Sequence, residues 1–168
     1  TPRPATPENV FGVVSGMLEH FSWKGPVGCG FPAIIRRGVT LSAANVDYQW
    51  IGFDALAELR RVAGPHAQIF NDADVAGLAE MAFGSGLELT AAEREVVLFL
   101  TLGTGIGSAL FFRGELLPNM EFGHIEMDGR DAEDLAAKVV REKENLTWED
   151  WGQRLNTYLR KIVFLVSP

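Results

Sequence analysis

The first stretch of the chain repeats apolar residues every three or four positions, which is the spacing of one face of an α-helix. These residues are Val10, Val13, Val14, Met17, Leu18 and Phe21. Thr6, Pro7 and Glu8 precede them and supply a capping hydroxyl, a proline suited to the first helical position and an acid in the first turn. The pattern therefore predicts a helix that begins at Thr6 and ends near Phe21.

Shorter apolar runs and further helical patterns alternate along the rest of the chain. Strands are predicted over residues 26–31, 67–70, 95–101 and 106–113, with a small hairpin over residues 34–41. The continuous apolar run predicts that the strand over residues 95–101 is buried. Helices are predicted over residues 54–62, 72–83 and 131–144, the last as one charged, solvated helix, and over residues 147–162. Because strands and helices alternate, the sequence predicts an α/β fold.

The composition is that of a globular protein with an acidic balance. Of the 168 residues, 47% are hydrophobic, and 22 acidic against 15 basic residues give a net charge of −7. Nucleic acid is not an expected partner, because its phosphates require a basic surface. No apolar run approaches the roughly 20 residues of a membrane-spanning helix, and no signal peptide is visible. We therefore expect a cytoplasmic protein with no membrane partner.

The two ends of the chain are typical of a fragment. The first residue is Thr1 and not Met, and Pro168 follows an apolar run over residues 162–166 that stops abruptly. We expect residues 1–168 to be part of a longer protein. The single cysteine, Cys29, excludes an internal disulfide and a multi-cysteine zinc site within this chain.

The first segment with candidate chemistry covers residues 69–74. A short apolar strand runs directly into Asn71 and Asp72 and then into an alanine-rich helix. Polar groups at the carboxyl end of a strand, beside a helix N-terminus, lie where α/β proteins bind ligands. Asp72 can accept a proton from a hydroxyl group. Simple helix capping by Asn71 or Asp72 is the alternative, whereas a metal site at Asp72 and Asp74 is disfavoured because residues two apart diverge on a helix.

The second segment is a turn rich in glycine and threonine between two apolar strands. Gly103, Thr104, Gly105 and Gly107 offer backbone amides and a hydroxyl to an anion. The spacing fits neither a dinucleotide fingerprint, which needs glycine where Ser108 stands, nor a P-loop. A tight hairpin turn with no ligand is the alternative.

The third segment, over residues 118–126, places two acids around a histidine. Glu121, His124 and Glu126 follow a turn, and His124 and Glu126 share a face if the segment is extended. Donors and acceptors in this alternation suit a polyhydroxylated ligand. Ordinary surface groups or a structural histidine are the alternatives. Zinc is disfavoured, because no cysteine is near and a catalytic zinc needs about three protein ligands.

These segments occur in the order seen in the ROK family of sugar kinases, and the chain resembles most closely its polyphosphate glucokinase branch. The resemblance is carried by TPRPATPENV, WKGPVGCGFPAIIRRGV, AANVDYQWIG, NDADVAGLAEMAFG, LTLGTGIGSALF, NMEFGHIEMDGRDAE and LTWEDWGQRLNTYL. The stretches spread over nearly the whole chain. Their combination is more specific than any one motif.

The resemblance implies an actin-like, ribonuclease-H-like α/β fold with two lobes. It implies phosphoryl transfer to the 6-hydroxyl of glucose, with Mg²⁺ and either polyphosphate or ATP as donor. It further implies a role for each candidate residue: Asp72 as general base, Asn45, Asn71, Glu121, His124 and, less firmly, Glu126 as sugar ligands, and Gly103, Thr104, Gly105 and Gly107 as the second phosphate-binding motif. The family is often dimeric, so a homodimer is a further expectation.

The chain also departs from the family pattern. The cysteine-rich zinc motif is absent, which fits the polyphosphate branch and implies no structural zinc. The first phosphate hairpin and the C-terminal glycine-rich segment are absent, so the resemblance implies that residues 1–168 are the central part of such a kinase. Activity of the isolated chain is therefore not expected. A sugar-binding protein without activity and an inactive remnant stay open as alternatives, but the presence of Asp72 and the lack of a helix-turn-helix segment favour the kinase.

Overall fold

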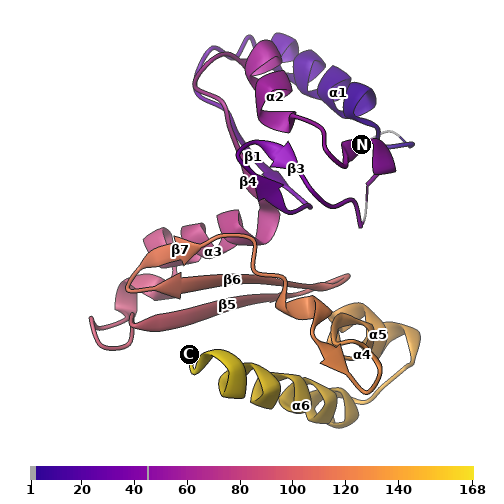
Figure 1. Cartoon of the computed structure of the whole chain (residues 1–168), viewed down its shortest axis with the longest axis vertical. Coiled ribbons are helices and arrows are strands. Elements are labelled where there is room, and N and C mark those ends of the chain that lie inside the picture. The colour runs from indigo at the N-terminus through magenta and orange to yellow at the C-terminus, as the bar shows by residue number, and fades with distance from the viewer. Residues whose placement is uncertain (1–2, 45) are drawn as a thin grey trace. The chain divides into compact units, whose positions relative to one another are not determined.

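The computed structural model describes residues 3–44 and 46–168 and divides the chain into two compact units (Figure 1). The first unit is Thr1–Val75 and the second is Ala76–Pro168. Each unit has its own hydrophobic core. No helix among the described residues is both long and apolar enough to cross a membrane.

The first unit builds two small sheets beside two helices. Its elements are α1 (Pro7–His20), β1 (Gly28–Phe31), β2 (Ile35–Arg36), β3 (Val39–Thr40), the 3-10 helix η1 (Tyr48–Trp50), α2 (Ala55–Ala63) and β4 (Gln68–Asn71), followed by the start of α3 (Asp72–Phe83). β1 and β4 pair in parallel, with Phe31 opposite Asn71, and β2 and β3 form an antiparallel hairpin. The parallel pair places the end of β4 beside the end of β1.

An aromatic cluster holds the first unit together. Trp50 is fully buried, its ring lies 4.2 Å from that of Phe31 and 5.8 Å from that of Phe11, and its Nε1 donates to the Ala5 carbonyl at 2.8 Å. The predicted helices at the start of the chain and after Asp54 are confirmed. Thr6 caps the first through the Asn9 amide and Asp54 caps the second.

The second unit is built on an antiparallel sheet. Its elements after α3 are η2 (Ser85–Glu88), β5 (Val96–Leu102), β6 (Ile106–Phe112), β7 (Glu115–Leu117), η3 (Phe122–His124), β8 (Glu126–Met127), β9 (Arg130–Asp131), α4 (Glu133–Ala136), α5 (Lys138–Lys143) and α6 (Trp148–Val166). The three-stranded sheet has the order β5-β6-β7, and a separate hairpin joins β8 and β9.

Successive residues of the central strand β6 point to opposite faces of the sheet. A Cβ added at Gly77 of α3 would lie 2.6 Å from Ala109 Cβ and 3.1 Å from the Phe111 ring, so α3 packs closely on one face. Ile106 belongs to the core formed with α4, α5 and α6 on the other face. The sheet therefore lies between α3 and α6, as Figure 1 shows, and α4 and α5 lie beside the turn that joins β5 to β6.

Two predictions about this unit are wrong. Every residue of β5 keeps partial exposure, because β5 is an edge strand and only β6 is central. The charged helix predicted over residues 131–144 is two short helices, since Ala137 adopts an extended backbone (φ −63°, ψ 153°) between α4 and α5. Nor is this segment simply solvated, because Leu135, Ala136, Ala137 and Val140 are buried.

Candidate functional site

Asn71 links β4 to α3 without an intervening residue. Its side chain is buried; Nδ2 donates to the Ala33 carbonyl at 3.2 Å, and Oδ1 accepts from the amides of Ala73 and Asp74 at 2.9 and 3.1 Å. Asn71 therefore caps α3 and ties it to the chain that follows β1. The capping interpretation is confirmed for this residue, and a sugar-binding role stays a prediction.

Asp72 is the exposed carboxylate at the first position of α3. Its Oδ1 accepts from the Ala73 amide at 2.9 Å. A Cβ added at Gly30 of β1 would lie 3.4 Å from Asp72 Cα, so β1 runs close to this residue. The Asp72 carboxylate is therefore accessible to a ligand, while its backbone lies close to β1.

Two further predictions in this unit concern Asp74 and Asn45. Asp74 is buried, with 2% of its surface exposed, whereas Asp72 is exposed, so the two carboxylates do not form a pair on the surface. Asn45 lies outside the described residues. The first unit therefore presents Asp72 as its candidate for acid–base chemistry.

In the second unit, the glycine-rich segment forms the hairpin turn between β5 and β6. The Gly103 amide donates to the Gly105 carbonyl at 3.0 Å, and the Gly107 amide donates to Thr101 Oγ1 at 3.2 Å. Gly103 and Thr104 are exposed. The hairpin interpretation is confirmed as the local structure, and binding of phosphate by the turn stays a prediction.

Glu133, the first residue of α4, reaches this turn. Its Oε2 accepts from the Ile106 amide at 3.0 Å, and a Cβ added at Gly105 would collide with the same oxygen. The Val139 amide of α5 donates to the Gly103 carbonyl at 3.1 Å. Both ends of the turn are therefore held by the helices that follow.

Ser108 anchors the segment that carries Glu121 and His124. Its buried hydroxyl donates to the Met120 carbonyl and accepts from the Phe122 amide at 3.0 Å. Glu121 thus lies between two residues that are tied to β6. Ser108, which stands where a dinucleotide fingerprint requires glycine, therefore has a structural role in this protein.

His124 is half-exposed and paired with an acid. Its Nδ1 lies 2.8 Å from Asp131 Oδ2 and 4.0 Å from Glu133 Oε1. The hydrogen bond to Asp131 raises the pKa of His124 above its ordinary value of 6.5; burial opposes this shift, and the negative charges of Glu133, Asp131 and Glu121 add to it. With Nδ1 directed at Asp131, Nε2 is the ring atom that can meet a ligand.

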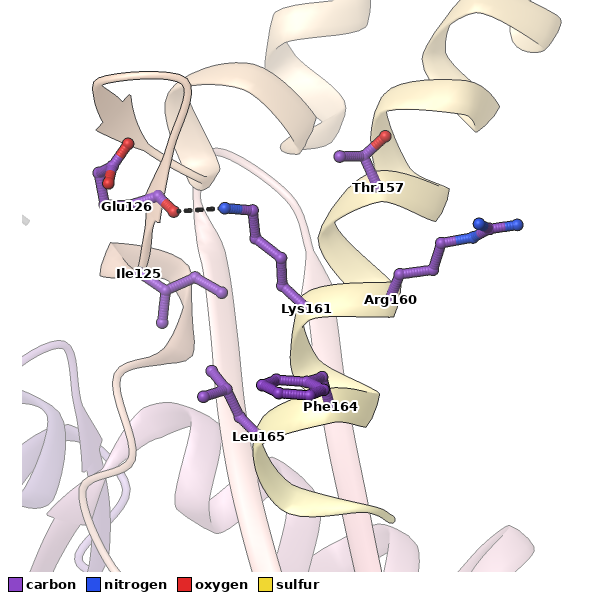
Figure 2. A pocket seen from close by; sticks show the side chains of 7 residues that line it. All are labelled: Ile125, Glu126, Thr157, Arg160, Lys161, Phe164 and Leu165. Atoms are coloured by element: carbon purple, nitrogen blue, oxygen red, sulfur yellow. Dashed lines mark hydrogen bonds between the residues drawn. The ribbon is translucent and has the colours of Figure 1, made fainter.

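Glu126 is engaged in the turn of the β8–β9 hairpin. Its Oε1 accepts from the Gly129 amide at 2.8 Å, and its carbonyl accepts from Lys161 Nζ at 3.2 Å. Figure 2 shows the open groove of about 730 Å³ beside this contact, where Phe164 and Leu165 of α6 form an apolar wall. The groove holds Glu126 but no other predicted site residue, so it does not mark the predicted site.

The structure therefore gathers the predicted residues into one group per unit. Asn71 and Asp72 form the first, and the Gly103–Gly107 turn with Glu121 and His124 forms the second, whereas the Glu126 carboxylate bonds to the turn of the β8–β9 hairpin. Sequence reasoning missed Asp131 and Glu133, because both were assigned to the charged run of a solvated helix. The available signal was their position, directly after the histidine segment and within one of the stretches that carry the family resemblance.

Comparison with known proteins gives a consistent family match. The model of the ROK family matches residues 1–145. The chain is 41% identical over 169 aligned positions to a polyphosphate glucokinase of Mycobacterium tuberculosis (strain CDC 1551 / Oshkosh). That alignment covers 100% of this chain and 62% of the relative, so the chain spans less than two thirds of the relative's length.

Solved structures also resemble the chain, and two of them are described here. An inorganic polyphosphate/ATP-glucomannokinase from Arthrobacter sp. strain KM is 45% identical, with a TM-score of 0.88 that covers 100% of this chain and 68% of the other. A ROK family glucokinase from Streptomyces griseus, in complex with glucose and AMPPNP, is 22% identical, with a TM-score of 0.66 that covers 87% and 53% of the two chains. At that identity, the second likeness supports the fold alone.

Proposed function

The chain belongs to the ROK family, and from that premise we propose that the protein phosphorylates the 6-hydroxyl of glucose, with inorganic polyphosphate or ATP as the donor. The observation that carries the proposal is the position of Asp72, an exposed carboxylate at the start of α3 and the end of β4. The likeness to polyphosphate glucokinases over the whole chain supports it. The fold is the actin-like, ribonuclease-H-like α/β fold of ROK sugar kinases, as expected.

In the proposed reaction, Asp72 is the general base. Phosphoryl transfer asks little covalent chemistry of a protein, so catalysis is mostly positioning and charge stabilisation. Asp72 accepts the proton of the 6-hydroxyl as that oxygen attacks the terminal phosphorus of the donor, and the bond from phosphorus to the leaving oxygen breaks. The fixed Asn71 holds the turn from which Asp72 projects.

We assign glucose recognition to Asn71, Glu121 and His124, and less firmly to Glu126. A carboxylate accepts from sugar hydroxyls, and an imidazole with one nitrogen bound by an acid presents the other to the ligand. Ser108 restricts the movement of the segment that carries Glu121 and His124. Asn45 remains part of the proposed sugar site.

The donor phosphates are assigned to the Gly103–Gly107 turn, together with Mg²⁺. Among the described residues, no three His, Cys, Asp or Glu side chains form a group that could hold a metal ion. We therefore derive no step from a metal held by these residues. Magnesium commonly binds through phosphate oxygens and water, with few protein ligands, which fits a cation that arrives on the donor.

A coupled assay for glucose 6-phosphate, run with polyphosphate and with ATP, tests the proposal in the full-length protein. Asp72→Asn is expected to reduce turnover by about 10²–10⁴-fold, the usual contribution of a general base. Glucose affinity, measured by calorimetry, is expected to change much less than the rate, because the amide keeps the shape of the side chain.

The matched control is Asp54→Asn, which changes an exposed aspartate at the start of another helix of the same unit. Its turnover is expected to stay within about threefold of the parent, far from the loss expected for a general base. Equal rates for Asp72→Asn and the parent would remove Asp72 from the chemistry. A parent protein that binds glucose but turns over neither donor would instead support the sugar-binding alternative.

A cytoplasmic location and a homodimer belong to the same proposal. The chain holds one cysteine, so it has no disulfide of its own that would require an oxidising compartment. Sedimentation of the full-length protein measures the oligomeric state directly, and a monomer at all concentrations would contradict the dimer.

A further inference from the structure

We propose that the open groove between β8 and α6 is a binding site for a small organic carboxylate with an apolar body, such as a medium-chain fatty acid. The groove has a volume of about 730 Å³; Ile125 and Glu126 form one side of it and α6 forms the other (Figure 2). Small-ligand sites have volumes of roughly 300–1,000 Å³. Asp72 and the glycine-rich turn lie outside the groove, so the inference is independent of the proposed kinase function.

The α6 side of the groove exposes a large apolar surface. The side chains of Phe164 and Leu165 are 88% and 58% exposed. They follow Arg160 and Lys161 by one helical turn, so each apolar side chain lies beside a cation on the surface of α6. Removal of such a surface from water is favourable, and an apolar ligand body would achieve it.

Two cations border this apolar surface. Lys161 Nζ donates to the Glu126 carbonyl at 3.2 Å, which is the one hydrogen bond that its ammonium makes with the described residues. The Arg160 guanidinium is exposed and makes no hydrogen bond or ion pair with them. Figure 2 shows the two side chains leaving α6 in different directions. Both cations therefore retain N–H donors for a ligand.

The acid that lines the groove is already engaged elsewhere. Glu126 Oε1 accepts from the Gly129 amide at 2.8 Å, in the turn of the β8–β9 hairpin. The acids of α6 itself, Glu149 and Asp150, belong to its first turn and lie about three turns before Lys161. The groove is thus locally cationic in a chain with a net charge of −7, which favours an anionic ligand over a cationic one.

A carboxylate joined to an apolar body satisfies both kinds of lining residue. A guanidinium can bind a carboxylate through two parallel hydrogen bonds, and the Lys161 ammonium can add a third. A neutral apolar molecule would cover the two cations without pairing them, which is costly. A polyanion without an apolar body would leave Phe164 and Leu165 exposed to water.

Titration of the full-length protein with octanoate, without glucose or a phosphoryl donor, tests the inference. The NMR signals of the Ile125 and Leu165 methyl groups are expected to shift and to saturate. The affinity is expected to fall as the salt concentration rises, because salt screens the attraction between charges. Octanol and inorganic phosphate each supply half of the chemistry, and both are expected to bind about tenfold more weakly or less.

Two substitutions locate the site. Lys161→Gln removes the charge but keeps an N–H donor for the Glu126 carbonyl, and Phe164→Ala removes the ring. Each is expected to weaken octanoate binding by about tenfold. The matched controls are Lys143→Gln and Phe83→Ala, which remove an exposed lysine of α5 and an aromatic ring that is 85% exposed at the end of α3. Both controls are expected to keep the affinity of the parent.

Three results would overturn the inference. Equal affinities for octanoate and octanol would show that the cations do not recognise the carboxylate. Equal loss of affinity in the variants and their controls would place the ligand elsewhere. Methyl signals that respond to protein concentration, and not to octanoate, would show that a second copy of the chain occupies the groove. Because no readout uses turnover, a parent without kinase activity would refute the proposed function and leave this test intact.

Discussion

The ionisation of His124 responds directly to its neighbours. Asp131 accepts from its Nδ1, and the charges of Glu133, Asp131 and Glu121 favour the imidazolium, so its pKa lies above 6.5. A raised pKa in the folded state stabilises the fold fully below the unfolded value of about 6.5. That contribution is lost as the pH rises through the pKa of the folded protein. Because the ring is half-exposed, solvent screening keeps it small.

Asp131→Asn is expected to lower the pKa of His124 towards its ordinary value, because an amide oxygen attracts the imidazolium less strongly than a carboxylate. An NMR titration of the ring measures it directly. Asp128→Asn is the control; it removes the same charge from the same hairpin, at a turn position with φ of 53° that asparagine tolerates. Equal pKa values in the two variants would contradict the pairing.

At the scale of the element, the contact between α3 and β6 depends on a residue without a side chain. A methyl group at Gly77 would lie 2.6 Å from Ala109 Cβ, well inside van der Waals contact. Overpacking of this kind costs about 1–3 kcal/mol, which exceeds the gain of up to about 1 kcal/mol that alanine brings to a helix. Gly77→Ala is therefore expected to lower the free energy of unfolding, measured in urea.

Gly16→Ala in α1 supplies the comparison. Apart from the adjoining residues and the backbone of α1 itself, no atom of the described residues lies within 4 Å of the added Cβ there. Only the helix propensity therefore changes, and the free energy of unfolding is expected to rise by up to about 1 kcal/mol. The two substitutions are chemically identical and should have opposite signs. A stabilised Gly77→Ala variant would show that α3 is more loosely packed on β6.

Elements with local signals could be predicted from the sequence. Helix α1 follows from the apolar spacing after Thr6 and Pro7, and α2 from the Asp54 cap and Gly64 at its end. The break in residues 131–144 could not, because no glycine or proline marks it. There, the burial of Leu135 and Ala136 and the turn of the chain at Ala137 outweigh helical continuity, and these depend on residues distant in sequence.

The same distinction applies to the candidate site. Asn71 and Asp72 could be found because one short segment contains the strand end, the cap and the carboxylate. Glu133 could not, because its contacts are with Ile106, 27 positions earlier, and with Gly105. A sequence shows an acid in a charged run, but only the fold shows which acid turns inward.

At the scale of the whole molecule, large apolar side chains remain exposed in both units. Phe21 is 68% exposed in the first, and Phe83 and Phe164 are 85% and 88% exposed in the second. Clustered exposed apolar surface favours association, so the 168-residue chain is expected to self-associate in solution. The neighbours of Phe164 on α6, Val163 and Leu165, are also exposed.

Phe164→Ser is expected to reduce this self-association, since it removes the most exposed aromatic ring on α6. Light scattering over a range of protein concentrations measures the change. Tyr48→Ser is the control, because it removes an aromatic ring that is 76% exposed in the other unit. Scattering that falls equally in both variants would show that no particular surface of α6 drives association.

The interruption between α4 and α5 has an entropic consequence for the glycine-rich turn. In an unbroken helix the Val139 N–H would bond to a carbonyl of the preceding turn, but here it is near the start of α5 and donates to Gly103. The loss of conformational freedom at this glycine therefore occurs when the chain folds. An anion that binds at the turn would meet a backbone that is already ordered, and its binding free energy would carry little further ordering cost.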